Sequence, residues 1–155
     1  MVAAASRVLL VDDEPDILGS LADYLQVGVP GVTFVRANDG QQALRELEKA
    51  SVDLIITDFR MPVLDGLGLL VQVNERWPGT PAILLTAFPD MDLAVRALND
   101  GRVRRFLTKP VEPSELRDLV KELLNAATAA KQREAALKRA ASRGGAKSPP
   151  GNRSG

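Results

Sequence analysis

Apolar residues fall into short continuous runs, and between these runs they recur at helical spacing. The runs are rich in Val, Ile and Leu and end on polar or turn residues, which is the pattern of strands buried on both faces. We therefore predict five strands. They lie at residues 7–11, 32–37, 54–56, 82–85 and 103–107.

The stretches between the strands predict five helices, because apolar residues recur there every three or four positions. The helices are expected at about 15–26, from Asn38 or Asp39, at 66–77, at about 90–99 and from about 113. Pro15 suits the first turn of its helix, and Asn38 or Asp39 can cap the second. The expected buried positions of the second and last helices are Ala43, Leu44, Leu47, Leu116, Leu119, Val120, Leu123 and Leu124.

Strands and helices alternate with short connections throughout. Such alternation favours a parallel sheet with helices on both faces. The predicted fold class is α/β, a doubly wound five-stranded parallel sheet of five β–α units with an extended C-terminal helix.

Composition excludes several kinds of chemistry. The chain has no His and no Cys, so it has no Ser-His-Asp or Cys-His catalysis, no thiolate chemistry and no phosphohistidine of its own. No apolar run approaches the ~20 residues needed to span a bilayer. Together with the absence of Cys, this leads us to expect a cytoplasmic protein with no membrane partner.

The net charge of zero conceals an asymmetry. Residues 126–155 carry seven Lys or Arg residues and one acid, a net charge of +6, so the rest of the chain carries −6. Residues 126–141 are mostly good helix formers, whereas Gly, Ser and Pro dominate afterwards. A solvated linker accounts for this basic segment better than a nucleic-acid contact does.

Polar residues stand at or just after the carboxyl ends of four of the predicted strands. Asp12 and Asp13 follow the first strand, Asp58 the third, Thr86 the fourth and Lys109 the fifth. In a doubly wound sheet these strand ends can converge on one crevice. Taken singly, each residue has an ordinary structural role, as a helix cap, a packing group or a solvated loop residue.

Together these residues predict a site for phosphoryl transfer. Several acids in one pocket repel one another, and oxygen ligands of this kind suit Mg²⁺. Lys109 and Thr86 could contact phosphoryl oxygens while the Asp58 carboxylate attacks as nucleophile.

Four motifs then match a known family in order. They are V-D-D-E at 11–14, T-D-F-R-M-P-V-L-D-G at 57–66, L-T-A at 85–87 and F-L-T-K-P at 106–110. Over residues 7–124 the chain closely resembles the receiver domain of bacterial response regulators, which is CheY-like. The resemblance implies that Asp58 accepts a phosphoryl group from a sensor histidine kinase or phosphotransfer protein and that the domain then binds a downstream protein target.

The same resemblance implies the individual site roles. Mg²⁺ would be held by Asp13, Asp58 and the backbone carbonyl of Arg60, with Asp12 acting through water. Thr86 and Phe106 would form the switch pair and Lys109 the phosphate contact. The peptide between Lys109 and Pro110 would be cis, as is the matching bond in the family.

Two other functions fit these residues less well. A receiver-shaped binding module that is never phosphorylated would normally have lost an acid or the lysine, and all are present. A Mg²⁺-dependent phosphatase with an aspartyl nucleophile would need a second carboxylate two residues later, where Arg60 stands. We therefore predict a phosphorylatable signalling domain rather than an enzyme with its own substrate.

The resulting domain plan is a receiver domain at 6–125, a helical extension at 126–141 and a disordered basic tail at 142–155. The chain is either a stand-alone regulator or a piece of a longer output protein. Leu116, Leu123, Ala130 and Leu137 are spaced by seven, which permits a coiled coil. Because Ala dominates the rest of the seam, we expect at most a weak homodimer.

Overall fold

The computed structural model describes residues 6–87 and 103–147 of the chain. Five strands form one sheet in the order β2-β1-β3-β4-β5, and all neighbouring pairs are parallel. The strands are β1 (Ser6–Val11), β2 (Val32–Ala37), β3 (Leu54–Asp58), β4 (Ala82–Thr86) and β5 (Val103–Thr108). The predicted doubly wound parallel sheet is therefore confirmed. The helix predicted at about 90–99 lies outside the described residues.

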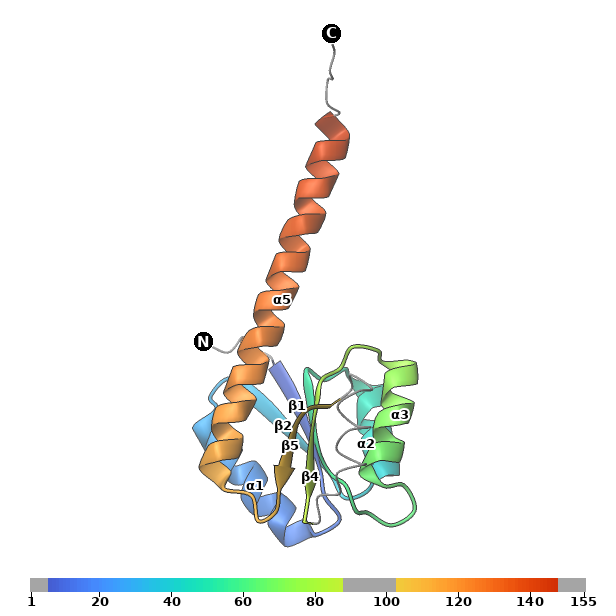
Figure 1. Ribbon diagram of the computed structural model, residues 1–155, viewed down its shortest axis with the longest axis vertical. Helices are drawn as coiled ribbons and strands as arrows, with labels where there is room; N and C mark the ends of the chain where they lie inside the picture. Colours follow the sequence, from blue (N-terminus) through green and yellow to red (C-terminus); the bar gives the residue numbers. More distant parts are fainter. Residues whose placement is uncertain (1–5, 88–102, 148–155) are drawn as a thin grey trace.

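Helices cover both faces of the sheet, as Figure 1 shows. They are α1 (Pro15–Gly28), α2 (Gly40–Lys49), α3 (Gly66–Arg76) and α5 (Pro113–Lys147). One face carries α1 and α5, and the opposite face carries α2 and α3.

Alternate side chains along each strand pack on opposite faces of the sheet, so the core is divided into two parts. In β1, Val8 and Leu10 pack with the residues of α1 and α5, whereas Leu9 and Val11 pack with those of α2 and α3. Successive side chains of a strand point to opposite faces. Because both sets are apolar, β1 is buried on both sides.

Short side chains fix where two helices begin. The Asp39 carboxylate accepts a hydrogen bond from the Gln42 N–H at 2.7 Å, which makes Asp39 the N-cap of α2. Asp65 likewise caps α3 by accepting from the Gly68 N–H at 2.7 Å. These bonds satisfy donors that the first turn of a helix leaves unpaired.

The strand order places a crevice at the carboxyl edge of the sheet. From β1 the chain moves outward to β2 and then back across β1 to β3. The connections after β1 and β3 therefore leave on opposite faces, and ligands of open α/β sheets bind at such a switch point. Asp12 and Asp58 lie at these two strand ends.

The edge strand β5 contains an irregularity that the sequence pattern did not predict. Ala82 pairs with Val103 and Ile83 pairs with Arg105, so Arg104 is an extra residue in the ladder. Such a bulge redirects the side chain of the inserted residue. Arg104 lines a cavity at the amino edge of the sheet, opposite the carboxylates.

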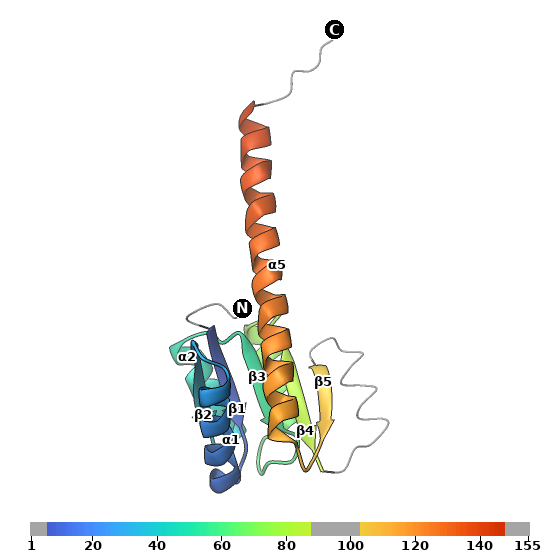
Figure 2. The same ribbon diagram turned by 90° about the vertical axis from the view of Figure 1, so that its left-hand side faces the viewer.

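Helix α5 projects far from the body of the domain (Figure 2). It runs to Lys147, past the end expected near residue 141, so residues 142–147 are helical rather than part of a disordered tail. Helix growth adds a hydrogen bond per residue once a helix is nucleated, and Gly opposes it far less than Pro. The first proline after Pro113 is Pro149, and α5 ends two residues before it.

One ion pair ties the emerging helix to the sheet. The Lys131 Nζ lies 2.8 Å from the Asp53 carboxylate, and the other oxygen of Asp53 accepts from the Arg7 N–H at 2.9 Å. Beyond Lys131 the described side chains of α5 are exposed, and Leu137 is 70% exposed. Within the described ranges, no helix has the length and apolar character that crossing a bilayer requires.

Candidate functional site

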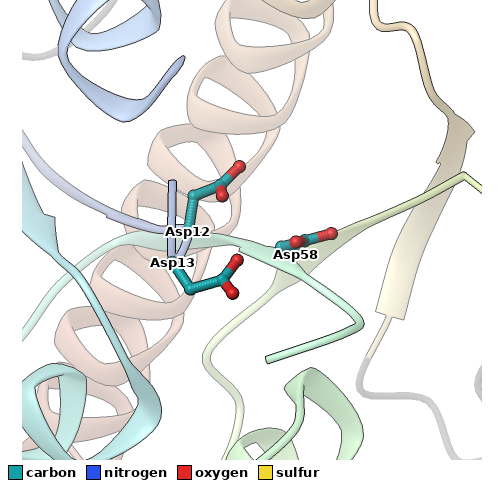
Figure 3. A group of neighbouring side chains, drawn as sticks. All are labelled: Asp12, Asp13 and Asp58. Atoms are coloured by element: carbon teal, nitrogen blue, oxygen red, sulfur yellow. The ribbon is translucent and has the colours of Figure 1, made fainter. Parts of the chain in front are cut away.

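Three carboxylates meet at the carboxyl edge of the sheet. Asp12 and Asp13 follow β1, and Asp58 is the last residue of β3. One oxygen from each lies within 4.8 Å of the others. Figure 3 shows Asp12 and Asp13 projecting from the end of β1 on the side where Asp58 lies.

Two of these acids are nearly buried, and backbone contacts hold one of them. Asp12 is 5% exposed and Asp58 is 6% exposed, while Asp13 is exposed. The Asp12 carboxylate accepts from the Glu14 N–H at 2.9 Å, and the Asp12 N–H donates to the Ala37 carbonyl at 3.2 Å. Buried carboxylates this close together require a cation or a proton to offset their repulsion.

Lys109 supplies one cation from the end of β5. Its Nζ lies 3.2 Å from Asp58 Oδ1 and 3.4 Å from Asp12 Oδ2. Its N–H donates to the Thr86 carbonyl at 2.7 Å, which extends the pairing of β4 and β5 by one residue. The peptide between Lys109 and Pro110 is cis, as the resemblance implied.

Burial dominates the ionisation of Asp58. Desolvation raises the pKa of the Asp58 carboxyl above its usual value; the Lys109 charge opposes this effect and the charges of Asp12 and Asp13 add to it. Desolvation alone would lower the pKa of Lys109, but the charges and hydrogen bonds of Asp12 and Asp58 outweigh it and raise that pKa. Lys109 is therefore held as a cation, while Asp58 binds its proton more tightly than a free aspartate.

The two predicted switch residues lie on neighbouring strands. Thr86 ends β4 and is 1% exposed, and it pairs in register with Thr108 of β5. Phe106 lies two residues before Thr108, pairs with Leu84 and is partly buried against the core under α2 and α3. The backbone of Thr86 thus contacts Lys109 of the site, and Phe106 lies on the adjacent edge strand.

The donors present suit a hard divalent cation. The converging ligands are all carboxylate oxygens, which Mg²⁺ prefers over softer sites. Beside them is a cavity of about 560 Å³ lined by Asp13, Phe59, Arg60, Met61, Pro62 and Asp65. Asp13 and the Arg60 loop therefore border the same space, and the residues present fit a Mg²⁺ ion.

Comparison with known proteins identifies the family. The family model described as the response regulator receiver domain matches residues 8–121, which include most of β1, the other four strands and the three carboxylates. The chain belongs to the response regulator receiver family.

Individual relatives agree with this assignment. The receiver is 39% identical over 119 residues to the transcriptional regulatory protein GlrR of Escherichia coli K12, covering 77% of this chain and 26% of GlrR. It is 35% identical over 118 residues to the DNA-binding transcriptional regulator NtrC of the same organism, covering 76% and 24%. The chain thus spans about a quarter of the length of the curated relatives it matches.

A solved receiver domain has the same fold. The CheY-like response regulator receiver domain protein from Methanospirillum hungatei JF-1 superimposes with a TM-score of 0.74 at 27% identity, covering 81% of this chain and 98% of that one. The match extends over nearly the whole of that structure. The chain is therefore a receiver domain of two-component response regulators, a class of signalling domains.

The receiver also has a groove that the sequence interpretation missed. It has a volume of about 750 Å³ and shares Asp12 and Lys109 with the site. Its further lining comes from the start and body of α1, from the end of β4 and from the segment joining β5 to α5, namely Glu14, Asp16, Ile17, Ser20, Leu21, Tyr24, Leu85, Ala87, Pro110, Val111 and Pro113. In the sequence, Ile17 and Tyr24 share the helical spacing of the core residues, so spacing alone does not set them apart. The structure shows that they are 44% and 37% exposed.

Proposed function

We propose that Asp58 accepts a phosphoryl group from the phosphohistidine of a sensor histidine kinase or phosphotransfer protein. The observation that carries the proposal is a nearly buried strand-end carboxylate with Lys109 at 3.2 Å and two further carboxylates beside it. No other described residues form such a group of three acids. The membership of the receiver family supports the same role.

In the proposed reaction an oxygen of the Asp58 carboxylate attacks the phosphorus of the donor. A P–O bond forms as the P–N bond to the donor's histidine breaks, and the electron pair of that bond returns to the imidazole. Lys109 Nζ already lies beside Asp58 Oδ1. It can therefore pair with an oxygen of the arriving phosphoryl group and offset its charge.

Asp13, Asp58 and the backbone carbonyl of Arg60 would hold Mg²⁺, with Asp12 acting through water. When bound, Mg²⁺ would neutralise negative charge on the carboxylates and on the transferred group. The ionised form of Asp58, which is the nucleophile, is disfavoured by burial. Occupation of the site would thus favour the reactive form of the acid.

The groove along α1 supports a protein rather than a small-molecule donor. A donor must bring its phosphohistidine to Asp58, and the groove shares Asp12 and Lys109 with the site. Ile17 and Tyr24 give this rim apolar surface that a partner could cover. We propose that the kinase or phosphotransfer protein contacts this surface.

Phosphorylation would then act on partner binding through Thr86 and Phe106. The Thr86 hydroxyl is proposed to contact the phosphoryl group, and the Phe106 side chain is proposed to rearrange with it on the adjacent strand. GlrR and NtrC are named as transcriptional regulators, and the match covers about a quarter of each. An output linked to nucleic acid would therefore depend on parts of a protein outside the receiver. We propose a protein target for the receiver itself, a cytoplasmic location, and no catalysis beyond its own phosphoryl transfer and slow dephosphorylation.

The experiment uses acetyl phosphate and Mg²⁺ with the full chain. Intact mass should increase by one phosphoryl group, and a chelator should abolish the increase. Asp58→Asn should not be labelled. Asp53→Asn is the matched control, because Asp53 precedes the same strand at the opposite edge of the sheet, and it should be labelled normally. Equal labelling of Asp58→Asn would refute the proposal.

A second variant separates phosphorylation from switching. Lys109→Ala should still accept the phosphoryl group, more slowly, because Asp58 and the other two acids remain. The phosphorylation-dependent NMR shifts of Thr86 and Phe106 should be lost, since no other cation contacts Asp58 among the described residues. Wild-type shifts in phosphorylated Lys109→Ala would contradict the proposed role.

A further inference from the structure

The loop between β3 and α3 holds one residue in a backbone conformation that its side chain disfavours. Val63 has a φ of 71°, and the Leu64 N–H donates to the Pro62 carbonyl at 2.8 Å, which makes a γ-turn of positive φ. This turn is rare, and a β-branched residue is poorly suited to it. The Val63 side chain is 92% exposed, so its own packing does not compensate. Neighbouring contacts must therefore hold the turn.

Leu64 makes those contacts with two glycines on different helices. A Cβ on Gly40 of α2 would lie 2.8 Å from Leu64 Cδ2 and 3.0 Å from its Cβ and Cγ. A Cβ on Gly68 of α3 would lie 2.9 Å from Leu64 Cδ1. Because glycine has no side chain, these two positions leave space that the Leu64 side chain fills. Leu64 also packs against the core beneath both helices.

Hydrogen bonds close the loop on either side of this contact. The Phe59 N–H donates to the Leu85 carbonyl at 2.8 Å, and the Gly66 N–H donates to the Phe59 carbonyl at 2.8 Å. Within the loop, Met61 is 8% exposed and packs in the same core as α2 and α3. The backbone of Arg60 therefore runs between fixed points, one of which is Leu64 packed against Gly40 of α2.

We propose that Leu64, seated against Gly40 and Gly68, is a positioning residue for the Mg²⁺ site. It fixes the path of residues 60–63 and thereby the position of the Arg60 carbonyl relative to Asp13. The inference rests on the proposed function, in which that carbonyl is a ligand. Groups that orient a ligand without touching the metal typically change metal affinity by roughly 10–100-fold when they are replaced.

The test measures Mg²⁺ affinity of the full chain by isothermal titration calorimetry. Leu64→Ala and Gly40→Ala should each weaken Mg²⁺ binding by about tenfold, although neither position carries a ligand. Gly40→Ala is the sharper variant: its methyl group would meet Leu64 Cβ, which no side-chain rotation can move, so the loop backbone must shift relative to α2. Leu64→Met keeps an apolar side chain of similar volume and should restore the affinity.

A matched control separates positioning from general loss of stability. Leu44→Ala removes another partly buried leucine from the same core, and it should lower the melting temperature while leaving Mg²⁺ affinity unchanged. Hydrogen exchange without Mg²⁺ gives a second readout. The amides of Leu64 and Gly66 should exchange faster in Leu64→Ala than in Leu44→Ala.

Two results would overturn the assignment of Leu64. One is wild-type Mg²⁺ affinity in both Leu64→Ala and Gly40→Ala, and the other is an equal loss of affinity in Leu44→Ala. Failure of the wild-type chain to bind Mg²⁺ is a different result, because it would refute the proposed metal site and this role together. The wild-type titration thus distinguishes failure of the proposed metal site from failure of the proposed positioning role of Leu64.

Discussion

Asp58 is an acid whose charged form the fold disfavours. Its pKa is raised chiefly by desolvation, so the folded chain binds this proton more tightly than the unfolded chain does. Above the unfolded value of 3.8 the ionised carboxylate therefore costs stability, and the cost grows as the pH rises through the folded pKa.

Asp58→Asn should therefore stabilise the metal-free protein at neutral pH. Replacing the carboxylate by a neutral amide removes the desolvation cost, and Lys109 keeps its contact with Asp12. The gain in melting temperature, measured with a chelator present, should shrink as the pH falls towards 3.8, where Asp58 is protonated. A gain that did not change with pH, or a loss at neutral pH, would contradict this account.

Single residues were also the part of the site that the sequence predicted best. Asp58 ends one strand and Lys109 follows another, so the parallel sheet alone was enough to bring them together. Leu64 could not be assigned in this way. Its partner Gly40 lies on another helix, and glycines near helix starts have many roles. Only the packed structure shows that the empty space at Gly40 is filled by Leu64.

At the scale of elements, the hydrophobic pattern predicted the strands because β1, β3 and β4 are buried along their lengths. Helix starts followed from their caps, as at Asp39. The bulge at Arg104 was not predictable, because two adjacent arginines in a strand give no sign of which is extra. The ion pair of Lys131 with Asp53 joins residues 78 positions apart and depends on the direction in which α5 leaves the sheet.

The junction between β3 and α3 should tolerate no side chain at Gly66. A Cβ there would overlap the Asp58 carbonyl oxygen and would lie 3.0 Å from Leu84 Cδ1. We expect Gly66→Ala to lower the free energy of unfolding by about 1–3 kcal/mol, as overpacking does. Denaturant unfolding at neutral pH measures this change.

Gly19 provides the matched control within α1. The nearest atom to a Cβ at Gly19 is Arg36 Nη1 at 3.5 Å, an ordinary contact distance. Gly19→Ala should therefore raise the free energy of unfolding by up to about 1 kcal/mol, because Ala favours a helix interior over Gly. Similar effects of the two substitutions would show that the close approach of Gly66 to Asp58 is unimportant.

For the whole molecule, α5 is the element that could pair two copies of the chain. Leu116, Leu123, Ala130 and Leu137 recur every seven residues, and the last two are exposed on the projecting helix. Burial of apolar surface contributes about 25 cal/mol per Å², and small seam residues bury little of it. We therefore expect at most a weak dimer, strengthened by phosphorylation of Asp58.

Analytical ultracentrifugation of the full chain and of a version ending at Asn125 tests this expectation. The full chain should show concentration-dependent association that increases with acetyl phosphate and Mg²⁺, and the shortened chain should not. Leu137→Ala is the finer variant, because it removes the largest exposed apolar side chain beyond Asn125 without shortening the helix. The same monomer under every condition would exclude a role for α5 in assembly.

The direction of α5 has a mechanical consequence. The helix leaves the domain at the edge opposite Asp58, and its part beyond Lys131 extends roughly 24 Å at ~1.5 Å per residue. A tilt of about 10° at Lys131 would move its far end by about 4 Å, as follows from that length. The helix is thus a lever arm with its fulcrum near Lys131 and Asp53, and a small shift in the sheet would become a displacement large enough to measure between a label on its tip and one on the body.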